Sequence, residues 1–171
     1  MNRETGIAAG VPADMLDAIE AAGLRPQVYV HPPVYTVEEA QAHWQNIPGA
    51  HTKNLFFKDA GGRLWLVTAL ADQRLDLKKL SQIIGSKRLS FGSSELLAQT
   101  LGVQPGSVSP LAILRDMDEK VTVVLDRKLM SFDLVNMHPG ANTATIGLTP
   151  SELCAFLTAQ RHDPLLADLD V

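Results

Sequence analysis

A β-hairpin in the middle of the chain constrains the fold more than any other sequence feature. Two runs with strong β propensity, 51–58 and 63–70, flank the turn sequence Asp59-Ala60-Gly61-Gly62. Asp and Gly tolerate the positive φ angles of short hairpin turns, so the two runs are expected to pair as antiparallel strands. Further strands are expected at 27–30, 121–125, 132–137 and 143–148. The centre of the protein is therefore expected to be a β-sheet.

Helices are expected at both ends of the chain and between the strands. Thr36 with Glu39, and Thr149 with Glu152, have the spacing of capping boxes, in which a hydroxyl and a carboxylate each satisfy a free helix amide. The expected helices are 12–22, 36–45, 76–84, 94–101 and one from 150 that buries Leu153, Phe156 and Leu157. The tail from His162 is acidic and is expected to be loosely held. This order of elements predicts an α+β fold.

Length and charge exclude several classes of protein. A chain of 171 residues suits a single domain, 1–171, and its net charge of −4 excludes nucleic-acid binding by bulk charge. The single cysteine, Cys154, excludes a disulfide framework and is expected in the core of the last helix. The first ten residues lack a secretory signal, and no apolar run is long enough to span a bilayer. These features predict a soluble cytoplasmic protein that contacts neither membrane nor DNA.

The pair Lys53-Asn54 is the first candidate for chemistry. It lies where a strand begins, and it can supply a point charge for a phosphate together with amide hydrogen bonds. Neighbours on a regular strand point to opposite faces, so both side chains can serve one site only at a strand end or a bulge. The alternative is an ordinary solvated lysine at the start of a strand.

Two further segments can contribute polar groups. Gly106 and Pro110 bracket a loop whose backbone amides could converge on an oxyanion, although the loop could equally be a plain helix–strand connection. His138, at a strand end before a turn, can orient a substrate or move a proton, or its ring can lie in water. The histidines show no HxH or HExxH spacing, so no metal site and no cofactor are expected.

The segment from Arg74 to Arg88 is basic. It has five cationic side chains and one acidic residue, Asp76, a local excess of +4. Such a cluster can be the footprint of a phosphate backbone or simply a solvated helix face.

Taken in order, these motifs resemble one family. Lys53-Asn54-Leu55-Phe56, then the Gly106–Pro110 loop, then Met137-His138-Pro139 is similar to the pattern of the YbaK and prolyl-tRNA-synthetase-associated editing family. The segment 31–40 resembles the N-terminal signature of the free-standing alanyl-tRNA(Pro) deacylases within that family. The similarity extends from about residue 12 to about residue 160.

The resemblance implies a mixed β-sheet curled into a partial barrel with surrounding helices. It also implies hydrolysis of alanine wrongly esterified to proline tRNA, by a positioned water at the terminal adenosine. In this interpretation Lys53 lies near the phosphate of that adenosine, the Gly106–Pro110 amides lie near the scissile carbonyl, and His138 positions the aminoacyl group. The apolar side chains of Met137 and Phe56 are expected to limit the size of that group.

The expected site therefore has three sets of residues. The catalytic set is Lys53, Gly106 and His138. The substrate-binding set is Asn54, Phe56, Ser107, Pro110, Met137, His31 and Thr36. The expected tRNA contacts are Arg74, Lys78, Lys79, Lys87 and Arg88.

Several alternatives remain at this point. The YbaK branch prefers cysteinyl-tRNA(Pro), so a cysteine-specific deacylase is one of them. A non-catalytic tRNA-binding or synthetase-associated module on the same fold is another, and a small-molecule hydrolase is a third. The expected partner is the acceptor end of mischarged tRNA(Pro), with prolyl-tRNA synthetase or elongation factor as possible suppliers of the substrate.

Overall fold

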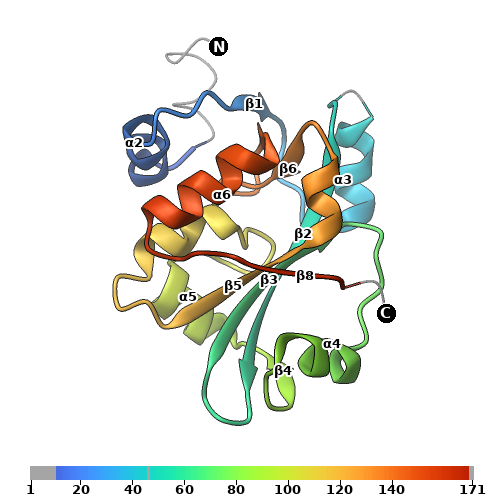
Figure 1. Ribbon diagram of the computed structural model, residues 1–171. Coiled ribbons are helices and arrows are strands. Elements are labelled where there is room, and N and C mark those ends of the chain that lie inside the picture. The colour runs from blue at the N-terminus through green and yellow to red at the C-terminus, as the bar shows by residue number, and fades with distance from the viewer. Residues whose placement is uncertain (1–10, 46, 170–171) are drawn as a thin grey trace.

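A computed structural model describes residues 11–45 and 47–169 (Figure 1). The expectation of no secretory signal concerns the first ten residues, which lie outside the described part, as do Asn46 and residues 170–171. The strands are β1 (Gln27–Val30), β2 (Ala50–Asp59), β3 (Leu64–Leu70), β4 (Leu89–Phe91), β5 (Val121–Asp126), β6 (Val135–Met137), β7 (Ala144–Leu148) and β8 (Leu165–Ala167).

The strands form one mixed sheet. Its order is β1-β7-β6-β2-β3-β5-β8, with β4 added beside β2. The β2–β3 hairpin is antiparallel, as are the β1–β7, β6–β7 and β2–β4 pairs, whereas β2–β6, β3–β5 and β5–β8 are parallel. The sheet does not close on itself, because β1 and β8 end the order. The expected α+β fold with a mixed, partly curled sheet is confirmed.

The α-helices form where the expected caps lie. They are α2 (Ala13–Ala21), α3 (Val37–Trp44), α4 (Leu77–Ile84), α5 (Ser94–Leu101) and α6 (Pro150–Ala159). The capping box of Thr149 and Glu152 is confirmed. The box at Thr36 is half formed, since the Thr36 hydroxyl accepts from the Glu39 amide but the Glu39 carboxylate accepts from the Tyr35 amide instead. No helix in the described part is long and apolar enough to cross a membrane.

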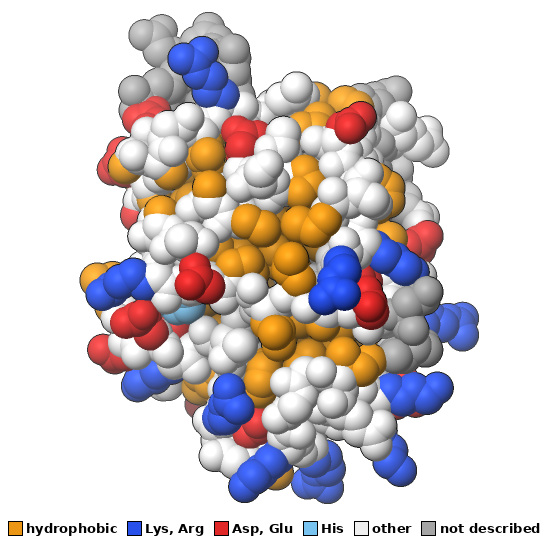
Figure 2. Space-filling model, viewed as in Figure 1, with side chains coloured by type: hydrophobic (Ala, Val, Ile, Leu, Met, Phe, Trp, Pro, Cys, Tyr) orange, Lys and Arg blue, Asp and Glu red, His pale blue; other side chains and the backbone are white. Residues whose placement is uncertain are grey.

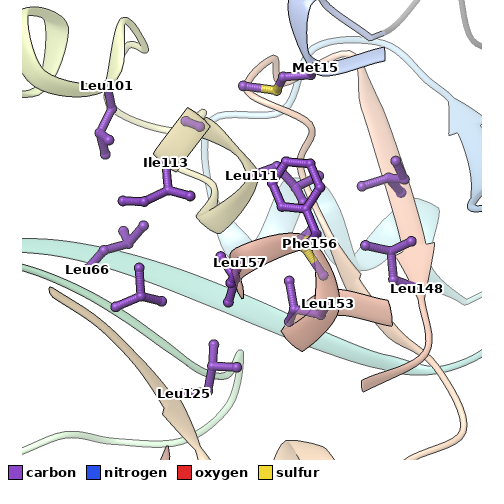
Figure 3. Close-up of a cluster of buried hydrophobic side chains, with 14 of the residues drawn as sticks. Met15, Leu66, Leu101, Leu111, Ile113, Leu125, Leu148, Leu153, Phe156 and Leu157 are labelled. Atoms are coloured by element: carbon purple, nitrogen blue, oxygen red, sulfur yellow. The ribbon is translucent and has the colours of Figure 1, made fainter. Parts of the chain in front are cut away.

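The two faces of the β2–β3 hairpin pack into different cores. Phe56 and Leu66 face a large core that α2, α5 and α6 complete, shown in Figure 3 around Phe156 and Leu111. Phe57 and Trp65 face a smaller core that α4 completes. Because side chains alternate along a strand, each residue of β2 belongs to one face or the other. This division decides where the candidate site residues point.

The expectation of a loosely held tail is wrong. β8 pairs in parallel with β5, and Leu169 is fully buried in the smaller core. His162 is also buried, and its Nε2 lies 2.8 Å from a carboxylate oxygen of Asp116. Asp116 accepts from the backbone amides of Lys120 and Val121 as well. The tail is thus anchored by a buried polar network and by apolar packing.

Other boundaries also differ from the expected ones. β6 starts at Val135 rather than at residue 132, because its pairing with β2 and β7 begins only there. η3, a 3-10 helix at Arg127–Ser131, follows β5. A second 3-10 helix, η2 (Pro110–Arg115), begins at the proline that ends the candidate loop. Cys154 is half-buried against the large core, its Sγ 3.9 Å from the Met130 sulfur, and burial raises the pKa of its thiol.

Candidate functional site

The candidate site is built around an interruption in the pairing along β2. On one side β2 is paired with β3 from Thr52 to Lys58. On its other side β6 pairs with Ala50 and His51, and β4 pairs with Phe57 to Asp59. From Thr52 to Phe56, β2 is paired with β3 on one side, and no strand of the described residues pairs with it on the other side. Lys53 and Asn54 lie within this interruption, so the sheet is open where the first motif is located.

Lys53 is half-buried on the face of the smaller core. Its cross-strand partner is Ala69, a member of that core, and its ammonium donates a hydrogen bond to the backbone carbonyl of Gln73. Burial lowers the pKa of Lys53, and the nearby Asp72 carboxylate partly offsets this effect. The ammonium is therefore held at the end of β3, close to an acidic side chain.

Asn54 points to the opposite face. It is paired with Thr68, whose hydroxyl donates to the Asn54 Oδ1 at 2.6 Å. The register from Thr52 to Lys58 is continuous and contains no bulge. The Lys53 and Asn54 side chains are thus on different faces of the sheet. A ligand can contact both only at the interruption beside β2, where the edge of the strand is open.

His138 follows β6 directly and is largely buried. Its Nδ1 lies 3.0 Å from the Ala144 carbonyl, which can only accept, so Nδ1 carries a proton and, in the neutral ring, Nε2 presents a lone pair. Burial lowers the pKa of His138; the Ala144 hydrogen bond opposes this shift and the nearby His31 adds to it. These effects favour a neutral His138 ring with an acceptor nitrogen at neutral pH.

His31 contacts His138 from the loop after β1. The two ring centroids are 6.3 Å apart in an edge-on arrangement, and His31 stacks on His43 of α3 at 5.1 Å. The His31 Nε2 lies 2.9 Å from the Thr145 hydroxyl, and its Nδ1 lies 2.9 Å from the Pro32 carbonyl. The segment expected to carry a family signature therefore packs directly against the candidate histidine.

The glycine–proline loop is well ordered by its own contacts. Gly106 has a φ of +90°, while no atom lies within 4 Å of the place where a Cβ would be, so its conformation rather than space requires glycine. The Ser107 amide donates to the Gln104 carbonyl, and the buried Ser109 hydroxyl caps η2. Since Pro110 has no amide hydrogen, Gly106, Val108 and Ser109 supply the other amide donors of this motif.

Backbone neighbours link the three motifs. The Thr52 hydroxyl donates to the Asn136 carbonyl at 2.7 Å, which joins β2 to β6 just before His138. A Cβ on Gly140 would lie 3.6 Å from the Val103 side chain, so the turn after His138 abuts the start of the glycine–proline loop. The segment before Lys53 therefore contacts the segment before His138, and the turn after His138 contacts the segment before Gly106. The Lys53 and Asn54 side chains themselves form hydrogen bonds with Gln73 and Thr68.

The other expected substrate contacts differ in how far they are buried. Met137 and Phe56 are 3% and 4% exposed and belong to the large core, where Phe56 packs closely on Gly92. Pro110 is buried in the same region, and Thr36 is the exposed N-cap of α3. Met137 and Phe56 can therefore limit the size of a substrate only through the way they pack in the large core.

A groove of about 330 Å³ lies where β2 begins and β3 ends, and Lys53 is not one of its lining residues. Gln41 of α3, His51, Asp72 and Phe132 line it. The sequence motifs did not include Asp72 and Gln73, although the hairpin register that pairs Lys53 with Ala69 brings the end of β3 beside Lys53. Thr68 could have been found, since a hairpin that pairs Lys58 with Leu64 must pair Asn54 with Thr68.

The expected tRNA contacts are all exposed. Figure 2 shows Lys and Arg side chains around the lower end of the molecule, where Figure 1 places α4, β4 and the hairpin tip. The five residues are Arg74, Lys78, Lys79, Lys87 and Arg88. Asp76, the acidic residue among them, caps α4 through the Lys79 amide. In the described part of the chain, no group of three or more His, Cys, Asp or Glu side chains is arranged to hold a metal ion.

Comparison with known proteins gives a consistent result. Residues 31–156 match the family described as the aminoacyl-tRNA editing domain. The chain is 38% identical to a prolyl-tRNA synthetase associated domain-containing protein 1 from Danio rerio, over 98% of this chain and 94% of that protein. It is 42% identical to the prolyl-tRNA editing protein ProX of Acetoanaerobium sticklandii, over 72% of this chain and 76% of ProX.

The fold is similar to that of a solved structure described as a candidate trans-editing enzyme for prolyl-tRNA synthetase. The two have a TM-score of 0.71 and 25% sequence identity, covering 93% of this chain and 96% of the other.

Proposed function

Since the chain belongs to the aminoacyl-tRNA editing domain family, we propose that it is a trans-editing hydrolase that removes alanine from mischarged tRNA(Pro). The single observation that carries this proposal is the family match over residues 31–156. The position of Lys53 in the interruption beside β2, and of His138 directly after the neighbouring strand β6, supports it. Similarity to ProX supports proline tRNA as the substrate class.

The proposed reaction needs little from the protein beyond positioning. An aminoacyl ester is already activated, so a held water can attack the carbonyl while backbone amides stabilise the oxyanion. One such donor typically contributes roughly 3 kcal/mol to transition-state stabilisation. In this account the amides of the Gly106–Pro110 loop act as the donors. The Lys53 ammonium exchanges the Gln73 carbonyl for the phosphate of the terminal adenosine.

His138 has the correct protonation state for a positioning role. With its Nδ1 proton donated to Ala144, the Nε2 lone pair can accept a hydrogen bond from the amino group of the substrate or from the attacking water. A protonated ring would repel the substrate ammonium group. The proposal therefore uses His138 as an acceptor rather than as a cation.

Selectivity for alanine over larger groups is assigned to Met137 and Phe56. A bulkier side chain at Met137 is expected to slow alanine release, and a smaller one to admit larger groups. Because Met137 is in the core, shrinking it to alanine also costs about 2–5 kcal/mol of folding stability. Met137→Val, which is smaller, and Met137→Phe, which is larger, are therefore the better test. An unchanged substrate range in both variants would exclude Met137 as the residue that limits the size of the substrate.

Only the acceptor end needs to be held, so a local basic patch is sufficient on a chain of net charge −4. We assign the contact with the RNA backbone to Arg74, which precedes α4, and to the cations of α4 and the α4–β4 loop. Prolyl-tRNA synthetase or elongation factor would deliver the charged tRNA, and the enzyme would act on it in the cytoplasm.

The test is release of labelled alanine from mischarged tRNA(Pro). Lys53→Ala is expected to abolish release, whereas Lys120→Ala, an exposed lysine paired with Asp118, should retain it. If the wild-type protein releases no alanine above the uncatalysed rate, the enzyme assignment fails. Equal rates for the wild type and Lys53→Ala would exclude the assigned role of Lys53.

A second candidate is a non-catalytic tRNA-binding or synthetase-associated module. One observation favours it: Lys53 and Asn54 are engaged by Gln73 and Thr68 on opposite faces of β2. Binding of uncharged tRNA(Pro) without any deacylation of a charged panel would support this module over the enzyme.

A further inference from the structure

Phe91, the last residue of β4, has an unusual position for a large aromatic side chain. It is 63% exposed, although its cross-strand partner Phe57 is fully buried. The two ring centroids are 4.9 Å apart with an interplanar angle of 36°. Phe57 thus supports the inner edge of the Phe91 ring, while the outer part of that ring is open to solvent.

The surroundings of Phe91 are cationic and polar. Lys58, Lys87 and Arg88 are exposed on β2 and on the loop leading into β4. Phe91 also borders a groove of about 400 Å³ between β4 and α5, with Lys58 at one side. Ser90, Ser93 and Gln99 line the groove with hydrogen-bonding groups, and Glu95 is its acidic member. A lone exposed phenylalanine is ordinary, but one that shares a groove with a lysine and with amide and hydroxyl groups fits a nucleic-acid strand.

Phe91 and Lys53 lie on the same face of the sheet. Paired residues of antiparallel strands share a face, so Lys53, Leu55 and Phe57 with Phe91 form one row. Four residues of strand separate the Lys53 and Phe57 positions, roughly 13 Å along β2. Leu55 and Phe57, between the two ends of this row, are packed in the smaller core. An unpaired stretch of RNA with its terminal phosphate at Lys53 would therefore pass over the outside of that core to reach the exposed ring of Phe91.

We propose that Phe91 is a stacking platform for an unpaired base of the tRNA 3′ end, upstream of the terminal adenosine. The inference rests on the proposed function, because it takes the terminal nucleotide to be at Lys53. The partner is single-stranded RNA: the cations hold its phosphates and the open ring face holds a base. Stacking of this kind is tolerant of base identity, so Phe91 contributes affinity for the strand rather than sequence selection.

The test uses an uncharged acceptor-stem minihelix of tRNA(Pro) with 2-aminopurine in its unpaired 3′ segment. Stacking on Phe91 should quench the probe when the wild-type protein binds. Phe91→Ala is expected to weaken binding by roughly 5- to 100-fold and to remove the quenching, and Phe91→Trp should keep both. Met117→Ala, with a side chain 68% exposed on another loop, is the matched control and should behave as the wild type.

The outcomes separate this inference from the proposed function. Equal affinity and equal quenching in the wild type and Phe91→Ala would overturn the stacking site, whatever the enzyme does. Loss of quenching in Phe91→Ala supports the site even if no deacylation is found, because the minihelix is uncharged. In the deacylation assay the stacking site predicts a raised KM with a largely retained kcat for Phe91→Ala. All binding is compared at one fixed salt concentration.

Discussion

At the scale of single residues, the environment of Lys53 sets the pH range in which the site can hold a phosphate. Burial lowers the pKa of its ammonium and Asp72 opposes that shift. The ammonium is therefore lost at a lower pH than in a free lysine, and the rate should fall as the pH rises through the lowered pKa. Removing the Asp72 charge should lower the pKa further.

Asp72→Asn is accordingly expected to move the alkaline limb of the deacylation profile to lower pH. The measurement is single-turnover alanine release against pH, with the uncatalysed hydrolysis of the ester subtracted at each point. Asp118→Asn removes an exposed carboxylate elsewhere and serves as the control. An alkaline limb that stays in place, or moves to higher pH, would contradict the assigned role of the Lys53 charge.

The pKa of His138 gives a second prediction at this scale. Burial lowers it most and His31 lowers it further, so His31→Gln should raise it. Titration of the ring protons by NMR measures this directly, with the His162 resonances as the internal reference. A His138 pKa that is unchanged or lower in His31→Gln would show that the two rings do not interact as the structure indicates.

The same shift has a consequence for stability. Between the lowered pKa of folded His138 and about 6.5, the unfolded chain binds more protons than the folded one. The contribution of His138 to stability is therefore complete above about pH 6.5 and is lost as the pH falls through the folded pKa. Because His31→Gln should raise the pKa of folded His138, it should narrow the pH range over which this contribution to stability is lost.

At the scale of elements, the tail shows how a buried polar contact can hold a short strand. Nδ1 and Nε2 of His162 face the Gln160 carbonyl and the Asp116 carboxylate. His162→Ala leaves part of the Asp116 hydrogen-bonding capacity unsatisfied in a buried place. We expect a loss of roughly 2–4 kcal/mol in the free energy of unfolding.

Urea denaturation of His162→Ala and Asp163→Ala checks this expectation. Asp163 is the adjacent exposed residue, and its substitution should change the unfolding free energy by less than about 0.5 kcal/mol. Equal stabilities for the two variants would mean that the tail is not anchored through Asp116.

Elements with local signals could be predicted from the sequence. The Asp59–Gly62 turn and the capping boxes place the hairpin and the main helices within a few residues, because turns and caps depend on neighbours in the chain. β4 and β8 are three residues long each and exist only through pairing with β2 and β5, so no local pattern marks them. The parallel β2–β6 pairing is equally non-local.

For the candidate site, too, only the features that depend on neighbouring residues in the chain could be predicted. Its motifs can be read locally, and the resemblance they carry names the family that the comparisons show. What the sequence could not supply is the environment of each motif. The contacts of Lys53 with the Gln73 carbonyl and Asp72 depend on how the chain leaves β3, and the contact of His138 with Ala144 depends on the turn between them. His31 comes from a distant segment that only the folded sheet brings beside His138.

At the scale of the whole molecule, charge is unevenly distributed. The chain is acidic overall, yet the exposed cations of α4 and the α4–β4 loop gather at one end (Figure 2). Each lysine that neutralises a phosphate contributes about 0.9 to the slope of log affinity against log salt on duplex nucleic acid. The double variant Lys78→Glu and Lys79→Glu should weaken binding and reduce that slope by about 1–2.

A matched double variant tests whether position rather than net charge matters. Lys120→Glu with Lys128→Glu changes the net charge equally on other exposed positions. Fluorescence anisotropy with uncharged tRNA(Pro) across a salt series measures affinity and slope for both variants. If both lose affinity alike, the effect is one of overall charge and the basic end is not the contact surface.

The most direct test of the central claim is a deacylation panel of tRNA(Pro) charged in turn with alanine, cysteine, serine and proline. The account predicts that the wild-type protein releases alanine far above the uncatalysed rate, spares proline, and loses the alanine activity in Lys53→Ala. Release of cysteine in preference to alanine would assign the YbaK-type specificity instead. Hydrolysis of none of the four charged tRNAs would contradict the claim that this fold is an editing enzyme.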